Sequence, residues 1–121
     1  MNRKILVKKD PRYPLEIKKI REIAKKILND KDLPENIELS VSFVGKRKAK
    51  ELNKDYREKS YIPKVLSFPM NEEGPDGVFR LGDVVICFPL ARREARQRQR
   101  MVNEIIKELL EHGIDNIISN S

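Results

Sequence analysis

VNEIIKELLEHGIDNIISNS, residues 102–121, is apolar at helical spacing and contains the only histidine of the chain, His112. Its apolar side chains recur three and four residues apart, which places them on one face of a helix: Ile105, Ile106, Leu109 and Leu110. An apolar helix face must be buried against another layer of the fold. We therefore predict that the final helix lies within residues 102–121 and that a sheet packs on it.

The stretches before this helix predict four strands and three more helices. Residues 37–43 alternate apolar and polar side chains, which is typical of a strand with one buried face. The other strands are predicted at residues 3–9, 65–68 and 79–88, and the other helices at residues 15–30, at 46–57 and from Pro89 onward. The order β-α-β-α-β-β-α-α predicts one α+β domain, in which a mixed four-stranded sheet packs with about four helices.

Two of these strands are predicted to form a hairpin. Pro69 is expected to end the strand at 65–68, since proline cannot donate a hydrogen bond to a neighbouring strand. Residues 71–77, NEEGPDG, predict the acidic turn that joins it to the strand at 79–88. The run LGDVVICF in that second strand is typical of an interior strand. Gly82 within the run indicates a β-bulge or the close approach of another backbone segment.

The composition limits the classes of protein to which this chain can belong. Its 121 residues suit one domain, and the single Cys87 excludes an internal disulfide framework and a cysteine-only zinc site. Residues 1–10 contain no apolar core of signal-peptide length. No apolar run approaches the ~20 residues that a membrane span needs. A cytoplasmic protein that does not bind a membrane is therefore expected.

The charge balance favours partners that carry phosphate. The net charge is +7, and basic proteins gain affinity for nucleic acids by releasing their counterions. Residues 92–100, RREARQRQR, are rich in arginine, whose planar guanidinium binds phosphate in a bidentate manner. The helix at 46–57 adds a second basic surface, and an RNA strand would lie between the two if they flank one groove. The alternative interpretation is that both helices expose solvated charged faces.

Three polar side chains lie within the predicted strands. Asp83 must be paired or functional if it is buried, and we expect a carboxylate at the end of the sheet that accepts hydrogen bonds from loop amides. Ser67 has no neighbouring base, so a hydroxyl bonded to backbone is expected rather than a nucleophile. Cys87 has no basic neighbour in sequence and is expected to be a small buried core residue.

His112 has two interpretations. Its place directly before Gly113 is typical of the C-terminus of a helix. The alternative is a metal ligand, but zinc sites usually need at least three protein ligands. A helix would offer the second ligand four residues on, where this chain has Asn116, a weak neutral ligand. Asp115 would be displaced around the helix. From these residues alone, the helix C-terminus is the favoured interpretation.

Five motifs follow one another along the chain: SVSFVG at 40–45, KELNKDYR at 50–57, VLSFP at 65–69, LGDVVI at 81–86 and ARREA at 91–95. This combination covers nearly the whole chain and resembles the bacterial YbeY family of rRNA maturation factors. The resemblance implies an α+β fold, a zinc ion held by three histidines, and cleavage of single-stranded RNA in rRNA maturation and ribosome quality control. It also implies that His112 is the first metal histidine and that Arg57 contacts RNA, which makes both candidate catalytic residues.

The sequence departs from the family pattern at the implied metal site. Asn116 stands at the position of the second histidine, and the third would fall one residue beyond Ser121. Lys64 replaces an acidic residue before VLSFP. We therefore expect a single YbeY-like domain over residues 1–121 that lacks the family's C-terminal end and whose zinc site is incomplete.

Two functional hypotheses result. In the first, the chain is a metal-dependent endoribonuclease that acts on ribosomal RNA and is impaired, because it supplies only one of three metal histidines. Its RNA-binding residues would be Arg57, Arg92, Arg93 and Arg96. In the second, the chain is a non-catalytic RNA- or ribosome-binding domain that has lost the metal site. Under the second hypothesis, the affinity for RNA would fall steeply as the salt concentration rises and would not change when a chelator is added.

Overall fold

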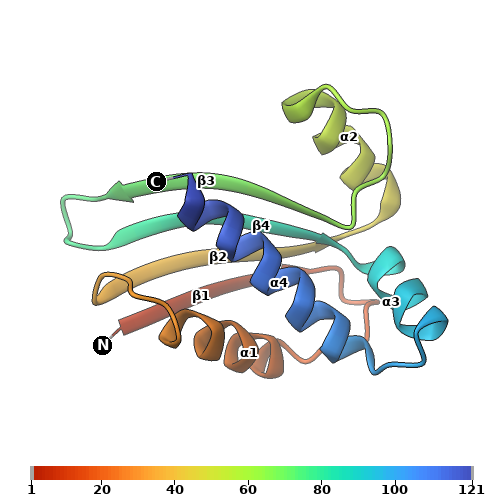
Figure 1. Cartoon of the computed structure of the whole chain (residues 1–121), viewed down its shortest axis with the longest axis horizontal. Helices are drawn as coiled ribbons and strands as arrows, with labels where there is room; N and C mark the ends of the chain where they lie inside the picture. The colour runs from red at the N-terminus through yellow and green to blue at the C-terminus, as the bar shows by residue number, and fades with distance from the viewer. Residues whose placement is uncertain (1, 121) are drawn as a thin grey trace.

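Four strands form one mixed sheet, in the order β1-β2-β4-β3, in a computed structural model that describes residues 2–120 (Figure 1). The strands are β1 (Asn2–Lys9), β2 (Asn36–Val44), β3 (Val65–Glu73) and β4 (Phe79–Cys87). β2 pairs in parallel with β1 and with β4, and β3 pairs antiparallel to β4. The predicted hairpin and the mixed sheet are therefore confirmed.

Four helices complete the predicted order of elements, and two of them cover one face of the sheet. The helices are α1 (Ile17–Asn29), α2 (Lys46–Arg57), α3 (Phe88–Gln97) and α4 (Val102–Ser119). α1 and α4 lie on the same face, while α2 stands apart from them at the β3 side of the molecule (Figure 1). The stretch in which the final helix was predicted ends at Ser121, which lies outside the described residues. No helix between residues 2 and 120 is both long enough and apolar enough to span a membrane.

Alternation along β2 separates the buried face of the sheet from the open one. Ile37, Leu39, Val41 and Phe43 are buried. They form one core with apolar residues of α1 and α4, which include Ile20, Ala24, Ile106, Leu110 and Ile114. The intervening polar residues of β2 point to the opposite face, because successive side chains of a strand alternate. The sequence prediction of a half-buried strand is confirmed, and the helix pair occupies its apolar side.

Pro69 does not end β3, contrary to the sequence prediction. The strand continues to Glu73, with a register irregularity between Pro69 and Glu72 and a positive φ of 47° at Asn71. β3 is an edge strand, and proline is tolerated there because the missing N–H leaves no neighbouring strand unpaired. The acidic turn is accordingly shorter than predicted, since residues 71–73 belong to the strand.

Gly82 marks a close approach of two backbone segments, as its position within a strand predicts. Its φ is +138°, and a Cβ at this position would lie 2.2 Å from the carbonyl oxygen of Phe68. The pairing of β2 with β4 also shifts register here, between Glu38 and Leu39. A residue with a side chain would therefore meet both backbone strain and a clash with β3.

Gly113 lies in the middle of α4, so the interpretation of His112 as a helix C-terminus is wrong. The helix continues to Ser119. A Cβ at Gly113 would lie 2.7 Å from Cγ1 of Val84 on the sheet. The absence of a side chain at Gly113 lets α4 lie close against β3 and β4. The glycine is therefore required for packing and does not end the helix.

Candidate functional site

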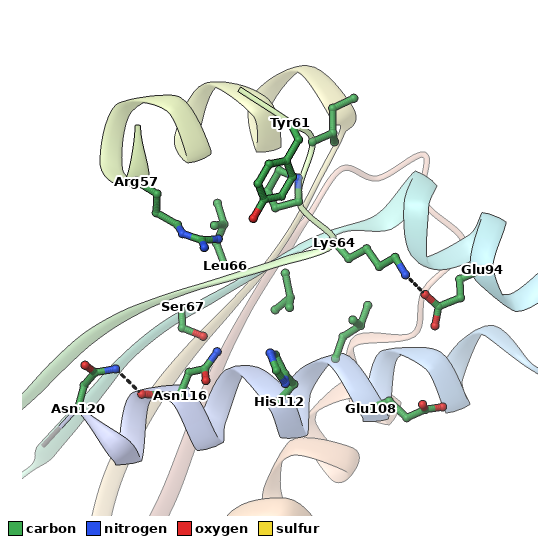
Figure 2. Close-up of a pocket in the computed structure, with 14 residues that line it drawn as sticks. Arg57, Tyr61, Lys64, Leu66, Ser67, Glu94, Glu108, His112, Asn116 and Asn120 are labelled. Carbon is green, nitrogen blue, oxygen red and sulfur yellow. Dashed lines mark hydrogen bonds and ion pairs between the residues drawn. The ribbon is translucent and has the colours of Figure 1, made fainter. Parts of the chain in front are cut away.

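A groove of about 840 Å³ runs between α4 and the edge strand β3 (Figure 2). Arg57 at the end of α2 overlooks it, and the connection from Tyr61 to Lys64 forms one wall. His112 and Asn116 form the opposite wall on α4. The structure therefore brings together Arg57 and His112, the two predicted catalytic residues, although they lie 55 positions apart in the sequence.

The α4 wall is a row of polar side chains at four-residue spacing. Glu108, His112, Asn116 and Asn120 all line the groove. Residues four apart lie one above the other on a helix face, so a helix that runs along β3 presents the whole row to the groove. The sequence prediction missed Glu108 and Asn120. Their four-residue spacing from His112 and Asn116 would have indicated them if the helix had been predicted to continue past Gly113.

Two hydrogen bonds fix α4 against β3. The Ser67 hydroxyl donates to the carbonyl oxygen of Gly113 at 2.8 Å, and the Asn71 side-chain amide donates to that of Ile117 at 3.0 Å. The prediction that the Ser67 hydroxyl bonds to backbone is confirmed, with a partner far away in sequence. Together with the close packing of Gly113, these bonds hold the backbone of His112 in a defined place.

Asn53, which the sequence prediction did not single out, holds the segment that carries Arg57. It is fully buried, and its side-chain amide donates to the carbonyl oxygen of Tyr61 at 3.0 Å. The N–H of Lys59 donates to the main-chain oxygen of Asn53 at 3.3 Å. Glu58 then reverses the chain with a φ of 57°. These contacts fix the end of α2 and so the direction in which Arg57 leaves it.

Arg57 is the uncompensated cation of the groove. It is exposed, it points from α2 toward the groove, and it has no ion pair or side-chain hydrogen bond within residues 2–120 (Figure 2). The acidic side chains of the groove have basic partners: Glu94 contacts Lys64 and Arg98, and Glu108 contacts Arg98 at 3.1 Å. The groove therefore presents a free guanidinium opposite a row of polar side chains whose one carboxylate, Glu108, is paired with Arg98, which suits a phosphate.

Lys64 controls the ionisation of Glu94. The Lys64 ammonium, and secondarily Arg98, holds the pKa of Glu94 below its ordinary value despite partial burial. A depressed carboxylate pKa stabilises the fold above the pKa of the unfolded chain. This contribution is lost as the pH falls through the folded-state pKa.

Replacement of Lys64 by methionine is expected to raise the pKa of Glu94, because the largest stabilising contact of the carboxylate is removed while Arg98 remains. NMR titration of the Glu94 side-chain carboxyl measures the change. Lys59→Met, at an exposed lysine of the same connection, is the control and should leave the titration as in the wild type. An unchanged Glu94 titration in Lys64→Met would show that the ion pair does not persist in solution.

The arginine-rich segment at residues 92–100 does not form one helix face. Arg92, Arg93 and Arg96 are exposed on α3 but do not line the groove, and their predicted RNA binding stays a prediction. α3 ends at Gln97, and the last two arginines of the segment pair with glutamates: Arg98 with Glu94 and Glu108, and Arg100 with Glu104 and Glu108. The two helices contribute Arg57 of α2 and Glu94 of α3 to the groove, so the arginines of α3 do not flank it.

The sequence predicted the burial of Cys87 correctly but not the position of Asp83. Asp83 lies in the middle of β4 and is exposed on the open face of the sheet, so its prediction as a buried or strand-end carboxylate is wrong. Cys87 is buried as predicted, and burial raises the pKa of its thiol. Neither side chain lines the groove.

The groove does not offer the ligands of a three-histidine zinc site. Zinc sites are built from imidazoles, thiolates and carboxylates. Within residues 2–120, no three histidine, cysteine, aspartate or glutamate side chains come together in a way that would hold a metal ion. His112 is followed along the row by the carboxamides of Asn116 and Asn120, and the latter donates to the main-chain oxygen of Asn116 at 2.6 Å. The residues present therefore do not fit the zinc ion that the resemblance implies.

The fold and the groove define an α+β protein whose last helix presents polar side chains to the edge of a mixed sheet, beside a free arginine. A family model described as Endoribonuclease YbeY matches residues 7–115. The chain belongs to this family, which confirms the resemblance seen in the sequence motifs.

Curated relatives agree with this membership. A protein named Endoribonuclease YbeY from Aquifex aeolicus is 45% identical over 83 residues, which cover 69% of this chain and 55% of the relative. Another protein of that name, from Persephonella marina, is 36% identical over 115 residues, or 94% of this chain and 74% of the relative. The match therefore spans only about half of the Aquifex protein's length. A solution structure from Thermotoga maritima has the same fold, with a TM-score of 0.64 at 22% identity over 91% of this chain and 69% of that one.

Proposed function

We propose that this chain binds single-stranded RNA in the groove between β3 and α4, and that it is an endoribonuclease whose cleavage step is impaired. The observation that carries the proposal is the free guanidinium of Arg57 turned toward the row that contains His112 (Figure 2). The names of the relatives support RNA as the substrate class. Ribosomal RNA is the substrate that the family resemblance favours.

Each groove residue has a role in this proposal that its chemistry allows. Arg57 would bind one phosphate through two parallel hydrogen bonds. His112 would lie beside that phosphate, where a neutral imidazole can accept a proton from an attacking hydroxyl. Asn116 and Asn120 offer both donors and acceptors to the sugar and base edges. Ser67 is engaged with Gly113 and serves to position α4.

The same residue set accounts for impaired cleavage. Breaking a phosphodiester bond requires a proton to leave the nucleophile and a proton to reach the leaving oxygen. Within residues 2–120 the groove offers one imidazole, His112, and its two carboxylates, Glu94 and Glu108, are held by basic partners. His112 alone would therefore have to accept one proton and donate the other. We expect the groove to retain RNA affinity better than it retains the rate of RNA cleavage.

Arg57→Ala is expected to weaken binding of a single-stranded RNA about tenfold to hundredfold, since a charge-assisted hydrogen bond is worth about 1.5–3 kcal/mol. The slope of log affinity against log salt should become less steep by roughly 0.7, the value for one lost contact to a single strand. Fluorescence anisotropy over a salt series measures both. Arg47→Ala is the matched control, because Arg47 lies on the same helix, is 95% exposed and pairs at 3.8 Å with Glu51. Equal losses in the two variants would contradict the assignment of Arg57 to the groove.

His112→Ala is expected to abolish residual RNA cleavage while it leaves most of the RNA affinity in place, because Arg57 and the carboxamides remain. Gel assays on a labelled single-stranded RNA, with and without a chelator, measure the cleavage. Lys107→Ala, on a neighbouring turn of α4 and outside the groove, is the control. If the wild-type chain cleaves rapidly and a chelator stops it, the proposal of impaired cleavage is overturned.

A further inference from the structure

A second hollow, of about 410 Å³, lies on the open face of the sheet, opposite α1 and α4. Its floor comes from the central strands and is mostly polar, with Ser40, Ser42 and Asp83 beside Val85. One side is aromatic and comes from Tyr56 of α2 and Phe68 of β3. None of these residues lines the first groove, and the proposed function does not use the hollow.

The aromatic side of the hollow has a free ring surface. The rings of Tyr56 and Phe68 meet edge to face, with centroids 5.1 Å apart at an interplanar angle of 77°. Tyr56 is nevertheless 68% exposed. An exposed aromatic ring steadied by a second ring suits the stacking of a planar ligand, and nucleic-acid bases stack on such side chains irrespective of their identity.

The hollow and the groove are neighbours across the edge of β3. Ser67 points to α4 and lines the groove, while the next residue, Phe68, points to the opposite face and lines the hollow. Arg57 lines the groove in the same way, and the preceding residue, Tyr56, lines the hollow. A linear polymer bound to Arg57 therefore has to cross only the edge of β3 to reach the rings of Tyr56 and Phe68.

The charges around the hollow favour a base on its floor and phosphates at its rim. Asp83 is exposed in the floor and repels a phosphate, but its carboxylate accepts hydrogen bonds from the exocyclic amines of bases. Cations lie on two sides of the hollow: Lys8 lines it on the β1 side, and Arg57 directly follows the lining residue Tyr56 at the end of α2. This distribution matches a polyanion with planar bases. An apolar protein partner is less favoured, since two hydroxyls and a carboxylate lie in the floor beside Val85.

We propose that the single-stranded RNA held in the groove crosses the edge of β3 and stacks one base on Tyr56 beside Phe68. This inference rests on the proposed function and extends it, because it assigns a base-stacking subsite to the face of the sheet away from His112. The subsite tolerates any base. It prefers bases with an exocyclic amine, because the Asp83 carboxylate can accept a hydrogen bond from that amine.

The test measures affinity for single-stranded oligoribonucleotides of increasing length, from about 4 to about 16 nucleotides. Tyr56→Ala should bind the longer oligonucleotides about fivefold to hundredfold more weakly than the wild type. It should bind the shortest ones, which fill only the groove, as the wild type does. The salt slope should be unchanged, because tyrosine carries no charge. Tyr56→Trp should retain the affinity, since it keeps a stacking ring.

Leu6→Ala is the matched control, because Leu6 is 37% exposed on the same open face and lies in β1, at the opposite edge of the sheet. The inference is overturned if Tyr56→Ala binds long oligonucleotides as the wild type does, or if Leu6→Ala shows the same loss. Failure of the proposed function looks different: the wild type would then show no salt-dependent binding at any length, and Arg57→Ala would have no effect. Thermal unfolding of each variant confirms that the exposed substitutions leave the fold intact.

Discussion

Gly82→Ala is expected to lower the free energy of unfolding by more than about 3 kcal/mol, the largest effect expected of a glycine-to-alanine change in this chain. The backbone at Gly82 has a φ of +138°. Such a conformation costs a residue with a side chain about 1–3 kcal/mol. The new Cβ would also lie 2.2 Å from the Phe68 carbonyl oxygen and 3.0 Å from the backbone nitrogen of Met70. Both are backbone atoms of the neighbouring strand and cannot rotate away.

Gly77→Ala separates the two contributions. Gly77 also has a positive φ, +78°, but a Cβ there would meet nothing within 4 Å. Its replacement should cost only the backbone term, about 1–2 kcal/mol. Chemical denaturation monitored by circular dichroism compares the two variants. Similar losses would mean that β3 moves away from β4 at little cost, and that the pairing of Phe68 with Asp83 is softer than the structure indicates.

Leu110→Ala is expected to destabilise the fold by about 2–5 kcal/mol, the usual range for a large-to-small change in a packed core. Leu110 is fully buried and belongs to the core between α4 and the sheet. The lost methyl groups leave a cavity in this core, which the surrounding side chains fill only in part. Because α4 carries His112 and the rest of the groove row, RNA affinity should fall at temperatures where the variant begins to unfold.

Leu109→Ala provides the comparison on the same helix. Leu109 is only half-buried and lines the groove. The free energy lost by exposing its apolar surface should therefore be about half of that for Leu110. Thermal and urea unfolding measure the stability of both variants, and RNA binding well below the transition measures the groove. If Leu109→Ala were as damaging as Leu110→Ala, the orientation of α4 described here would be wrong by one position in the helix.

The sequence determined the elements and the sheet face that is buried. Alternation in residues 37–43 and helical spacing in 102–110 are local properties, set by the periods of a strand and a helix. They predicted the order of elements, the hairpin and a bulge or close backbone approach at Gly82, all of which the structure confirms. The motifs also sufficed to place the chain in its family.

The prediction failed where position in the sheet overrides local preference. Pro69 breaks an interior strand, but β3 lies at an edge and continues past it. Gly113 ends many helices, but here it lets α4 approach Val84, and the hydrogen bonds from Ser67 and Asn71 accompany that approach. No local pattern contains this information, since it depends on which segment lies beside the residue.

The candidate site was decided by tertiary structure. His112 and Arg57 were singled out from motifs, but only the packing of α4 along β3 and the bonds of Asn53 to the segment after α2 bring them to one groove. The same packing excluded the arginines of α3 from that groove and paired Arg98 and Arg100 with glutamates. Sequence spacing fixes which side chains share a face of one element, because that follows from the repeat of the backbone. Which faces meet depends on the burial of the whole core, and it was this that placed Tyr56 and Phe68 on one side of β3 and His112 on the other.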